Sequence, residues 1–286
     1  MRATTKLRTM FAAGHTIVAP GAFDGLSARL VEQAGFSAVY ASGGAIARST
    51  GVPDIGLISP DEIVSRLAAM VEVVGIPLIA DADTGYGNAL NAQRAARAFE
   101  RAGVAAFHLE DQTFPKKCGH YDDKTLVSVA EMVQKLHAVR DALQDPDFIV
   151  IARTDAIAVE GYAAAIDRAG HYIEAGADVI FVEAPTSEAE IADIARRLPG
   201  WKLINMFQGG KTPLLPITRL QELGYQCVII PSDTQRAAIK AMQRVLATIA
   251  RDGSSAAMSA DMVSFKEREA VIDTAGFLDR DKRYAS

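Results

Sequence analysis

Eight short apolar segments, separated by amphipathic stretches, constrain the fold of this chain more than any other feature of its sequence. Most of them are nearly continuous in apolar residues rather than alternating, which is typical of strands covered on both faces. Strands of this kind pair in parallel. We expect parallel strands at residues 17–20, 38–41, 77–81, 105–110, 148–153, 179–183, 202–206 and 225–231.

The stretches between these strands carry helical patterns, the clearest at residues 61–73, 91–101, 128–143, 162–175, 187–198 and 234–251. Ser59, followed three residues later by Glu62, resembles a capping box at the start of one helix. Eight alternations of strand and helix predict an α/β protein, a (β/α)8 TIM barrel. Because no linker divides the chain, we expect residues 1–286 to form a single barrel domain, with 252–286 as a C-terminal helical extension.

Composition favours chemistry on a small molecule. The formal net charge of -5 argues against a surface for nucleic acid or anionic membrane, because such surfaces need clustered lysine and arginine. No run of about 18 apolar residues could span a bilayer, and the N-terminal segment is a poor signal peptide. Two cysteines, Cys118 and Cys227, do not make a disulfide framework. We therefore expect a cytoplasmic protein.

Polar side chains follow seven of the eight predicted strands, at the end where TIM barrels bind their substrates. Any one of them could simply start a turn or cap a helix. Their recurrence after strand upon strand instead predicts that they converge on one site. The residues are Ser42, Asp81, Asp83, Glu110, Arg153, Asp155, Glu183, Asn205, Ser232 and Arg236.

Asp81, Asp83 and Glu110 form the predicted metal site. Two of these acids are separated by a single residue, and Glu110 should approach them from the adjacent strand. Three crowded carboxylates repel one another unless a cation joins them, and oxygen ligands suit Mg²⁺, with Mn²⁺ as the alternative. The spacing of His and Cys does not suggest zinc, so we expect the scattered histidines, His108 among them, to be surface or packing residues.

Two further groups of residues suit a small dicarboxylate. Arg153 is rigid and always charged, which favours a bidentate grip on a carboxylate. Ser42, Gly43 and Gly44 offer backbone N–H groups that can approach an anionic oxygen closely. Asn205 can donate to a second carboxylate. A small dianionic acid held between metal and arginine is the predicted ligand.

Cys118 lies in the long loop that follows the fourth predicted strand, next to Lys117 and close to His120. Cationic neighbours favour the thiolate, so we expect this thiol to be more acidic than a free one at about 8.5. An exposed loop cysteine without a function is the alternative. Cys227 is instead expected to be a small core residue. We predict that Cys118 acts as an acid or nucleophile.

The segments DADTGYGN, EDQ, PKKCGH, ARTDA, VEAP and NMFQGGKTP, in this order and spacing, resemble the isocitrate lyase and phosphoenolpyruvate mutase superfamily. The likeness is to its short lyase branch, which includes 2-methylisocitrate lyase, 2,3-dimethylmalate lyase and petal-death-type lyases. It implies a Mg²⁺-dependent lyase that splits a 2-hydroxy-dicarboxylate by a retro-aldol reaction into a 2-oxo acid, pyruvate or glyoxylate, and a second carboxylic acid. It also implies a homotetramer, a dimer of dimers that exchanges a C-terminal helix between subunits.

The resemblance assigns roles motif by motif. Cys118 would be the catalytic acid, with Lys117 and His120 beside it, and Asp81 and Asp83 would hold the metal with Glu110 nearby. The substrate would be bound by Ser42, Gly43, Gly44, Gly119, Arg153, Glu183, Asn205 and Arg236.

Some residues depart from the pattern of the superfamily. Gln208 stands where many relatives have glutamate, and Tyr121, Asp122 and Asp123 replace a segment in which 2-methylisocitrate lyases place an arginine. The loss of that cation favours a substrate smaller than a tricarboxylate, such as an alkyl-substituted malate.

Three alternatives to this lyase stay open. The first is oxaloacetate hydrolysis or decarboxylation on the same scaffold. The second is phosphoryl transfer of the phosphoenolpyruvate mutase or carboxyphosphonate phosphorylmutase type, which is disfavoured because mutases usually carry asparagine at the position of Cys118. The third is a metal or ligand binder without catalysis, in which replacing Cys118 would leave every activity unchanged.

Overall fold

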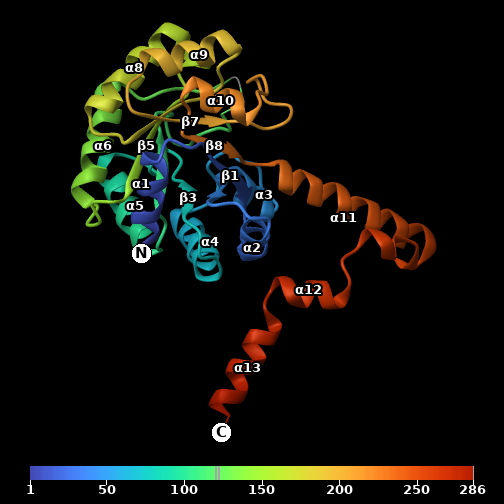
Figure 1. Cartoon of the computed structure of the whole chain (residues 1–286). Coiled ribbons are helices and arrows are strands. Elements are labelled where there is room, and N and C mark those ends of the chain that lie inside the picture. Colours follow the sequence, from blue (N-terminus) through green and yellow to red (C-terminus); the bar gives the residue numbers. More distant parts are fainter. Residues whose placement is uncertain (120, 122, 286) are drawn as a thin grey trace. The chain divides into compact units, whose positions relative to one another are not determined.

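The computed structural model describes residues 1–119, 121 and 123–285, and a closed barrel of eight parallel strands forms the core of its first 233 residues (Figure 1). Each strand pairs with the next in sequence, and β8 returns to β1. The strands are β1 (Ile17–Ala22), β2 (Val39–Ala41), β3 (Leu78–Asp81), β4 (Ala106–Glu110), β5 (Ile149–Thr154), β6 (Val179–Val182), β7 (Trp201–Asn205) and β8 (Cys227–Ile230). The predicted (β/α)8 barrel is confirmed.

Helices surround the barrel and begin where the sequence supplies caps. The Ser59 hydroxyl accepts from the Glu62 N–H and the Glu62 carboxylate accepts from the Ser59 N–H, so the expected capping box starts α4. Five short helices were not singled out from the sequence: α1 (Ala3–Ala12), α2 (Gly25–Gln33), α3 (Gly43–Ser49), α7 (Ile157–Glu160) and α10 (Ile217–Leu223). The other barrel helices are α4 (Pro60–Val73), α5 (Ala89–Arg101), α6 (Val129–Ala142), α8 (Tyr162–Glu174) and α9 (Glu188–Arg197).

The apolar core has two parts. One lies between the strands and the surrounding helices and includes Phe107 and Leu136. The other fills the inside of the barrel and is continued by Leu7 and Phe11 of α1. The Phe11 ring lies 5.2 Å from the ring of Trp201, the first residue of β7. Helix α1 therefore closes the amino-terminal end of the barrel and leaves the opposite end for the polar residues.

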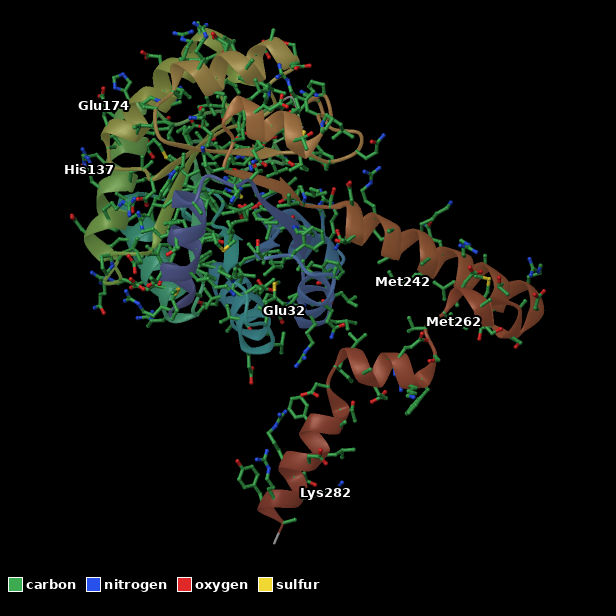
Figure 2. The ribbon with its side chains drawn as sticks, viewed as in Figure 1. Glu32, His137, Glu174, Met242, Met262 and Lys282 are labelled. Carbon is green, nitrogen blue, oxygen red and sulfur yellow. The ribbon has the colours of Figure 1, made fainter. Side chains whose placement is uncertain are left out.

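The chain divides into two compact units, Met1–Asp233 and Thr234–Ser286. The second contains nearly all of α11 (Asp233–Asp252), a 3-10 helix at Ala256–Asp261, α12 (Phe265–Val271) and α13 (Thr274–Tyr284). Figure 2 shows the side chains of this unit, including Met242 and Met262, which are both exposed. Among the described residues, no helix is both long and apolar enough to cross a membrane.

Candidate active site

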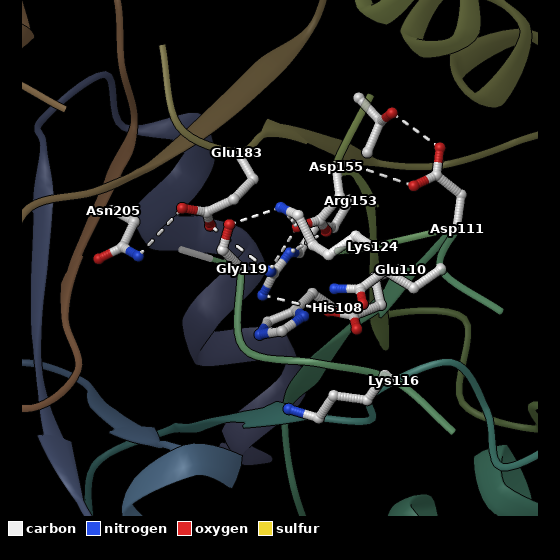
Figure 3. Close-up of polar contacts among 12 residues, drawn as sticks. His108, Glu110, Asp111, Lys116, Gly119, Lys124, Arg153, Asp155, Glu183 and Asn205 are labelled. Atoms are coloured by element: carbon white, nitrogen blue, oxygen red, sulfur yellow. Dashed lines mark hydrogen bonds and ion pairs between the residues drawn. The ribbon is translucent and has the colours of Figure 1, made fainter. Parts of the chain in front are cut away.

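Polar residues from neighbouring strands meet at the carboxyl end of the barrel (Figure 3). The strand register brings them together, because Asp81 pairs with His108 and Glu110 pairs with Arg153. Within β4, His108 has the same parity as Ala106 and Glu110, so all three side chains face the inside of the barrel. The predicted convergence of Asp81, Glu110 and Arg153 at one rim is therefore what the structure shows.

Arg153 lies at the centre of this rim and is buried. Its Nε lies 2.9 Å from Asp155 Oδ2, its Nη1 3.2 Å from Glu110 Oε2 and its Nη2 3.8 Å from Glu183 Oε2. Burial by itself lowers the pKa of Arg153, but these three carboxylates outweigh burial and raise it. The guanidinium thus stays charged, and a substrate carboxylate would share it with acids of the chain.

Asp81, His108 and Glu110 each present a ligand atom within 4.8 Å of the others. Glu110 is fully buried; its Oε2 lies 3.2 Å from Arg153 Nη1, whereas its Oε1 accepts no hydrogen bond from the described residues. Burial raises its pKa well above the usual value despite the nearby Arg153. A buried carboxylate oxygen without a donor is the group that a bound cation would satisfy. The donor set of this cluster therefore fits a divalent metal ion.

His108, expected to be a surface or packing residue, is fully buried and adds a nitrogen to this cluster. Its Nε2 lies 2.7 Å from the Tyr40 hydroxyl, and its ring packs edge-on against Phe181. Burial lowers the pKa of His108 to about 4, so the ring is neutral at pH 7. The alternation of β4 was the sequence signal that could have placed it beside Glu110.

The first acid of the DAD segment stays ionised. Burial alone raises the pKa of Asp81, but His108, Lys116 and Arg153 together lower it to about 2. Since His108 is neutral at pH 7, the lasting positive charge near Asp81 comes from the lysine and the arginine. Asp81 therefore offers a charged oxygen to a metal at neutral pH.

Asp83 lies outside the three-residue cluster and contacts a lysine instead. Its Oδ1 lies 2.8 Å from Lys116 Nζ, which also lies 2.5 Å from Asp54 Oδ1. Burial raises the pKa of Asp83 to about 7 even though Lys116 opposes the shift. Its φ of 46° is left-handed, a conformation that Asp tolerates better than most residues. A ligand role for Asp83 stays a prediction.

The loop that carries Cys118 presents a different lysine from the one expected. Lys117 Nζ donates to the Asp123 carbonyl at 2.8 Å, and its side chain is 41% exposed. Lys116, one residue earlier, is the lysine buried among the acids. Cys118 is half-buried, whereas His120 lies outside the described residues. The catalytic roles expected of Lys117 and His120 stay predictions.

Glycines let this loop and α3 approach the rim closely. A Cβ on Gly119 would lie 2.4 Å from Arg153 Nη2 and 3.1 Å from Glu183 Cγ. A Cβ on Gly43 would lie 2.8 Å from Asp81 Oδ2, and one on Gly44 would lie 2.7 Å from an oxygen of Asp54. A side chain at any of these positions would displace a polar group of the rim, which is a physical reason for glycine at each of them.

The remaining predicted residues divide between the two units. Ser42 caps α3 by accepting from the Ala45 N–H. Asn205 lies beside Glu183, with its Nδ2 3.5 Å from Glu183 Oε1. Ser232, predicted at the end of the eighth strand, follows β8, and Arg236 belongs to the second compact unit. A substrate contact for Arg236 stays a prediction.

Sequence reasoning missed three charged residues of this region: Asp54, Lys116 and Lys124, which are all buried. Lys116 and Lys124 lie in the long loop that follows β4, and Asp54 lies between α3 and α4 in the long connection that follows β2. Loop length was the available signal, because long loops after barrel strands carry functional residues.

Comparison with known proteins places the chain among enzymes. Residues 7–250 match the family described as phosphoenolpyruvate phosphomutase. The chain is 44% identical to the 2,3-dimethylmalate lyase of Eubacterium barkeri, over 93% of each chain. It is also 44% identical to the 2-methylisocitrate lyase of Bacillus subtilis, over 96% of this chain and 89% of the relative.

Solved structures agree with these matches. A crystal structure of 2,3-dimethylmalate lyase superposes with a TM-score of 0.94 and 34% identity, covering 99% of this chain and 96% of the other. A structure of oxaloacetate acetylhydrolase with the inhibitor 3,3-difluorooxalacetate superposes with the same TM-score and 30% identity, covering 99% and 97%.

Proposed function

Because the chain belongs to the phosphoenolpyruvate mutase and isocitrate lyase superfamily and is a carbon–carbon lyase, we propose that it cleaves a 2-hydroxy-dicarboxylate with the help of a bound divalent cation. The substrate class is a substituted malate of the 2,3-dimethylmalate or 2-methylisocitrate type. The products are a 2-oxo acid, pyruvate or glyoxylate, and a second carboxylic acid. One observation carries the proposal: Asp81, His108 and Glu110 present ligand atoms within 4.8 Å of one another at the rim, and Glu110 Oε1 is buried there without a donor from the described residues.

Asp81 and Glu110 would hold the cation, which we take to be Mg²⁺ with Mn²⁺ as a possible substitute, and His108 and Asp83 lie beside them. When bound, the cation would supply positive charge to the hydroxyl and carboxylate oxygens of the substrate. Arg153 binds a substrate carboxylate and keeps its position through Asp155.

We propose that cleavage follows a retro-aldol course. The 2-hydroxyl gives up its proton to a neighbouring base, the C2–C3 bond breaks, and its electron pair moves onto the carboxylate of the leaving fragment. The new C2 carbonyl belongs to the 2-oxo acid. The leaving fragment is then protonated at carbon, and we assign this proton to the thiol of Cys118.

Hydrolysis of oxaloacetate is the second candidate. The TM-score of 0.94 with oxaloacetate acetylhydrolase favours it, because the same scaffold supports that reaction in a protein 30% identical to this chain. Fold alone does not determine the reaction. The two candidates differ in the substrate that is consumed and in the acid that is released.

We further propose that the protein is a cytoplasmic homotetramer, a dimer of dimers, that binds neither nucleic acid nor membrane. Large apolar side chains of the second unit support self-association, since Phe265 is 73% exposed and Phe277 is 56% exposed. Such side chains commonly mark an interface. Mass measurement in solution tests this proposal: a monomer at micromolar concentration would contradict it.

One screen separates the candidate activities. Purified protein with Mg²⁺ would be incubated with 2,3-dimethylmalate, 2-methylisocitrate, oxaloacetate and phosphonopyruvate, and the acids formed would be identified. We expect release of a 2-oxo acid from a substituted malate, and loss of that activity in EDTA. Oxalate and acetate from oxaloacetate alone would favour the hydrolase, and turnover of phosphonopyruvate alone would favour phosphoryl chemistry. No turnover of any of them would favour a binding protein.

A further inference from the structure

A fully buried lysine, Lys124, belongs to the same loop as Cys118 but has no role in the proposed cleavage step. Its Nζ lies 2.7 Å from Asp155 Oδ1 and also donates a hydrogen bond to the Gly119 carbonyl (Figure 3). Both side chains of the Lys124–Asp155 pair are completely shielded from solvent. A buried ammonium costs several kcal/mol unless it is paired and hydrogen-bonded, so these two partners fix its position.

The Asp155 end of this connection belongs to the rigid barrel. The Asp155 N–H donates to Asp111 Oδ1 at 2.9 Å, and the Thr154 hydroxyl donates to Asp111 Oδ2 at 2.7 Å. Tyr172 and Arg168 of α8 donate to the same Asp111 oxygen. Buried, multiply bonded groups of this kind hold one geometry. Asp155 is therefore a fixed point to which a loop can be attached.

The Gly119 end lies directly after Cys118. A Cβ added to Gly119 would lie too close to Arg153 and Glu183. On the other side of the thiol, the Gln112 amide donates to the Lys117 carbonyl and accepts from the Lys117 N–H, both at 2.9 Å. The segment that carries Cys118 is thus held before the thiol by Gln112 and after it by Lys124.

We propose that Lys124 is a positioning residue that fixes the segment carrying Cys118 beside Arg153 and Glu183 by tying the Gly119 carbonyl to Asp155. The catalytic consequence rests on the proposed role of Cys118 as proton donor, whereas the tie itself does not. Without the ammonium, the Gly119 carbonyl loses a donor and the loop loses one link to the barrel. A displacement of about 1 Å in a catalytic group can lower the rate about 10²-fold.

Alkylation of Cys118 by iodoacetamide measures the tie without any substrate. We expect Lys124→Met, assayed as the full-length protein with Mg²⁺, to be alkylated at Cys118 about tenfold faster than the parent, and its kcat to fall about 10²-fold. Lys124→Arg keeps the charge, so its alkylation rate at Cys118 and its kcat should both lie closer to those of the parent. Peptide mass mapping would separate Cys118 from Cys227, which is buried in the barrel core.

Lys202→Met is the matched control. Lys202 is also a buried lysine, but its Nζ donates to the Leu198 and Gly200 carbonyls, far from the loop in sequence. This variant should lose stability as Lys124→Met does and keep the parent alkylation rate. If Lys124→Met fails to fold, Lys124→Gln supplies the same comparison.

An unchanged alkylation rate in a folded Lys124 variant would overturn the proposal, because the lysine would then be structural only. Faster alkylation together with an active Cys118→Ser variant would keep the tie and refute the acid role of the thiol instead. The two failures are therefore distinguishable.

Discussion

At the amino-terminal end of the barrel, Arg8 and Arg140 both bind Asp178, whereas at the carboxyl-terminal end Arg153 binds Asp155 and Glu110. The first group is partly exposed, with side chains that are 17–29% accessible, and Asp178 also accepts from the Val150 N–H. The second group is 0–9% accessible, and Glu110 Oε1 accepts no hydrogen bond from the described residues.

This difference distinguishes two kinds of charged residue. Those at the amino-terminal end stabilise the fold, whereas those at the rim are arranged to bind a ligand. At the amino-terminal end, each ion pair joins elements that are distant in the chain. Contact with water lowers the desolvation cost of these pairs. At the rim, Arg153 and Lys116 already offset part of the cost of burying several carboxylates together, and a bound cation would offset more of it. Substitutions at the rim should therefore affect activity, and substitutions at the other end should affect stability.

The largest effect is expected from Cys118→Ser. A hydroxyl is a much weaker acid than a thiol, so carbon–carbon cleavage should fall about 10²–10⁴-fold. Binding of Mn²⁺, measured by calorimetry, should change little, because Cys118 lies outside the cluster formed by Asp81, His108 and Glu110. Turnover within about tenfold of the parent would remove the acid role.

Glu110→Gln tests the rim itself. Removing this buried charge should lower kcat/KM about 10²–10³-fold and weaken metal binding. The melting temperature should stay near that of the parent, because a neutral amide is easier to bury than a carboxylate and Arg153 keeps Asp155 and Glu183 as partners. A large fall in melting temperature would place Glu110 with the structural charges and break the comparison.

Asp178→Asn is the reciprocal test at the amino-terminal end. It removes the charge that Arg8 and Arg140 share, so the free energy of unfolding should fall by about 1–3 kcal/mol. Turnover should remain within a few-fold of the parent. Chemical denaturation and the same oxo-acid assay measure the two quantities, and a selective loss of turnover would contradict the assignment.

The sequence predicted the barrel well because continuous apolar runs have few alternatives to a buried parallel strand. It also predicted which strand ends carry acids, because the last residues of parallel strands all lie at the same end of the barrel. It did not distinguish Lys116 from Lys117, because an irregular loop has no periodicity from which to infer which side chain turns inward. His108 was missed for another reason: its residue type suggested a surface or packing residue, whereas the parity of β4 places it on the same face as Glu110.

The second unit shows a further limit of sequence reasoning. Its helices are recognisable from their patterns, but α12 and α13 contain no buried residue within the chain. Apolar periodicity indicates that one face of a helix packs against another element, but it does not identify that element. A single sequence therefore gives these helices without giving their partner.

The smallest effect should appear in the pH dependence of stability, where the two ends are expected to have opposite signs. The Thr5 hydroxyl and Arg2 lower the pKa of Asp147 at the amino-terminal end, so its contribution is present above about pH 4 and is lost as the pH falls. Burial raises the pKa of Asp83 to about 7, so its contribution is present below about pH 4 and is lost as the pH rises through 7. Denaturation in EDTA between pH 3 and pH 8 should show that Asp147→Asn reduces the acid-side loss and that Asp83→Asn reduces the loss between pH 4 and pH 7. If both variants changed the pH dependence of the free energy of unfolding in the same direction, the two ends of the barrel would not differ in how they stabilise their charged residues.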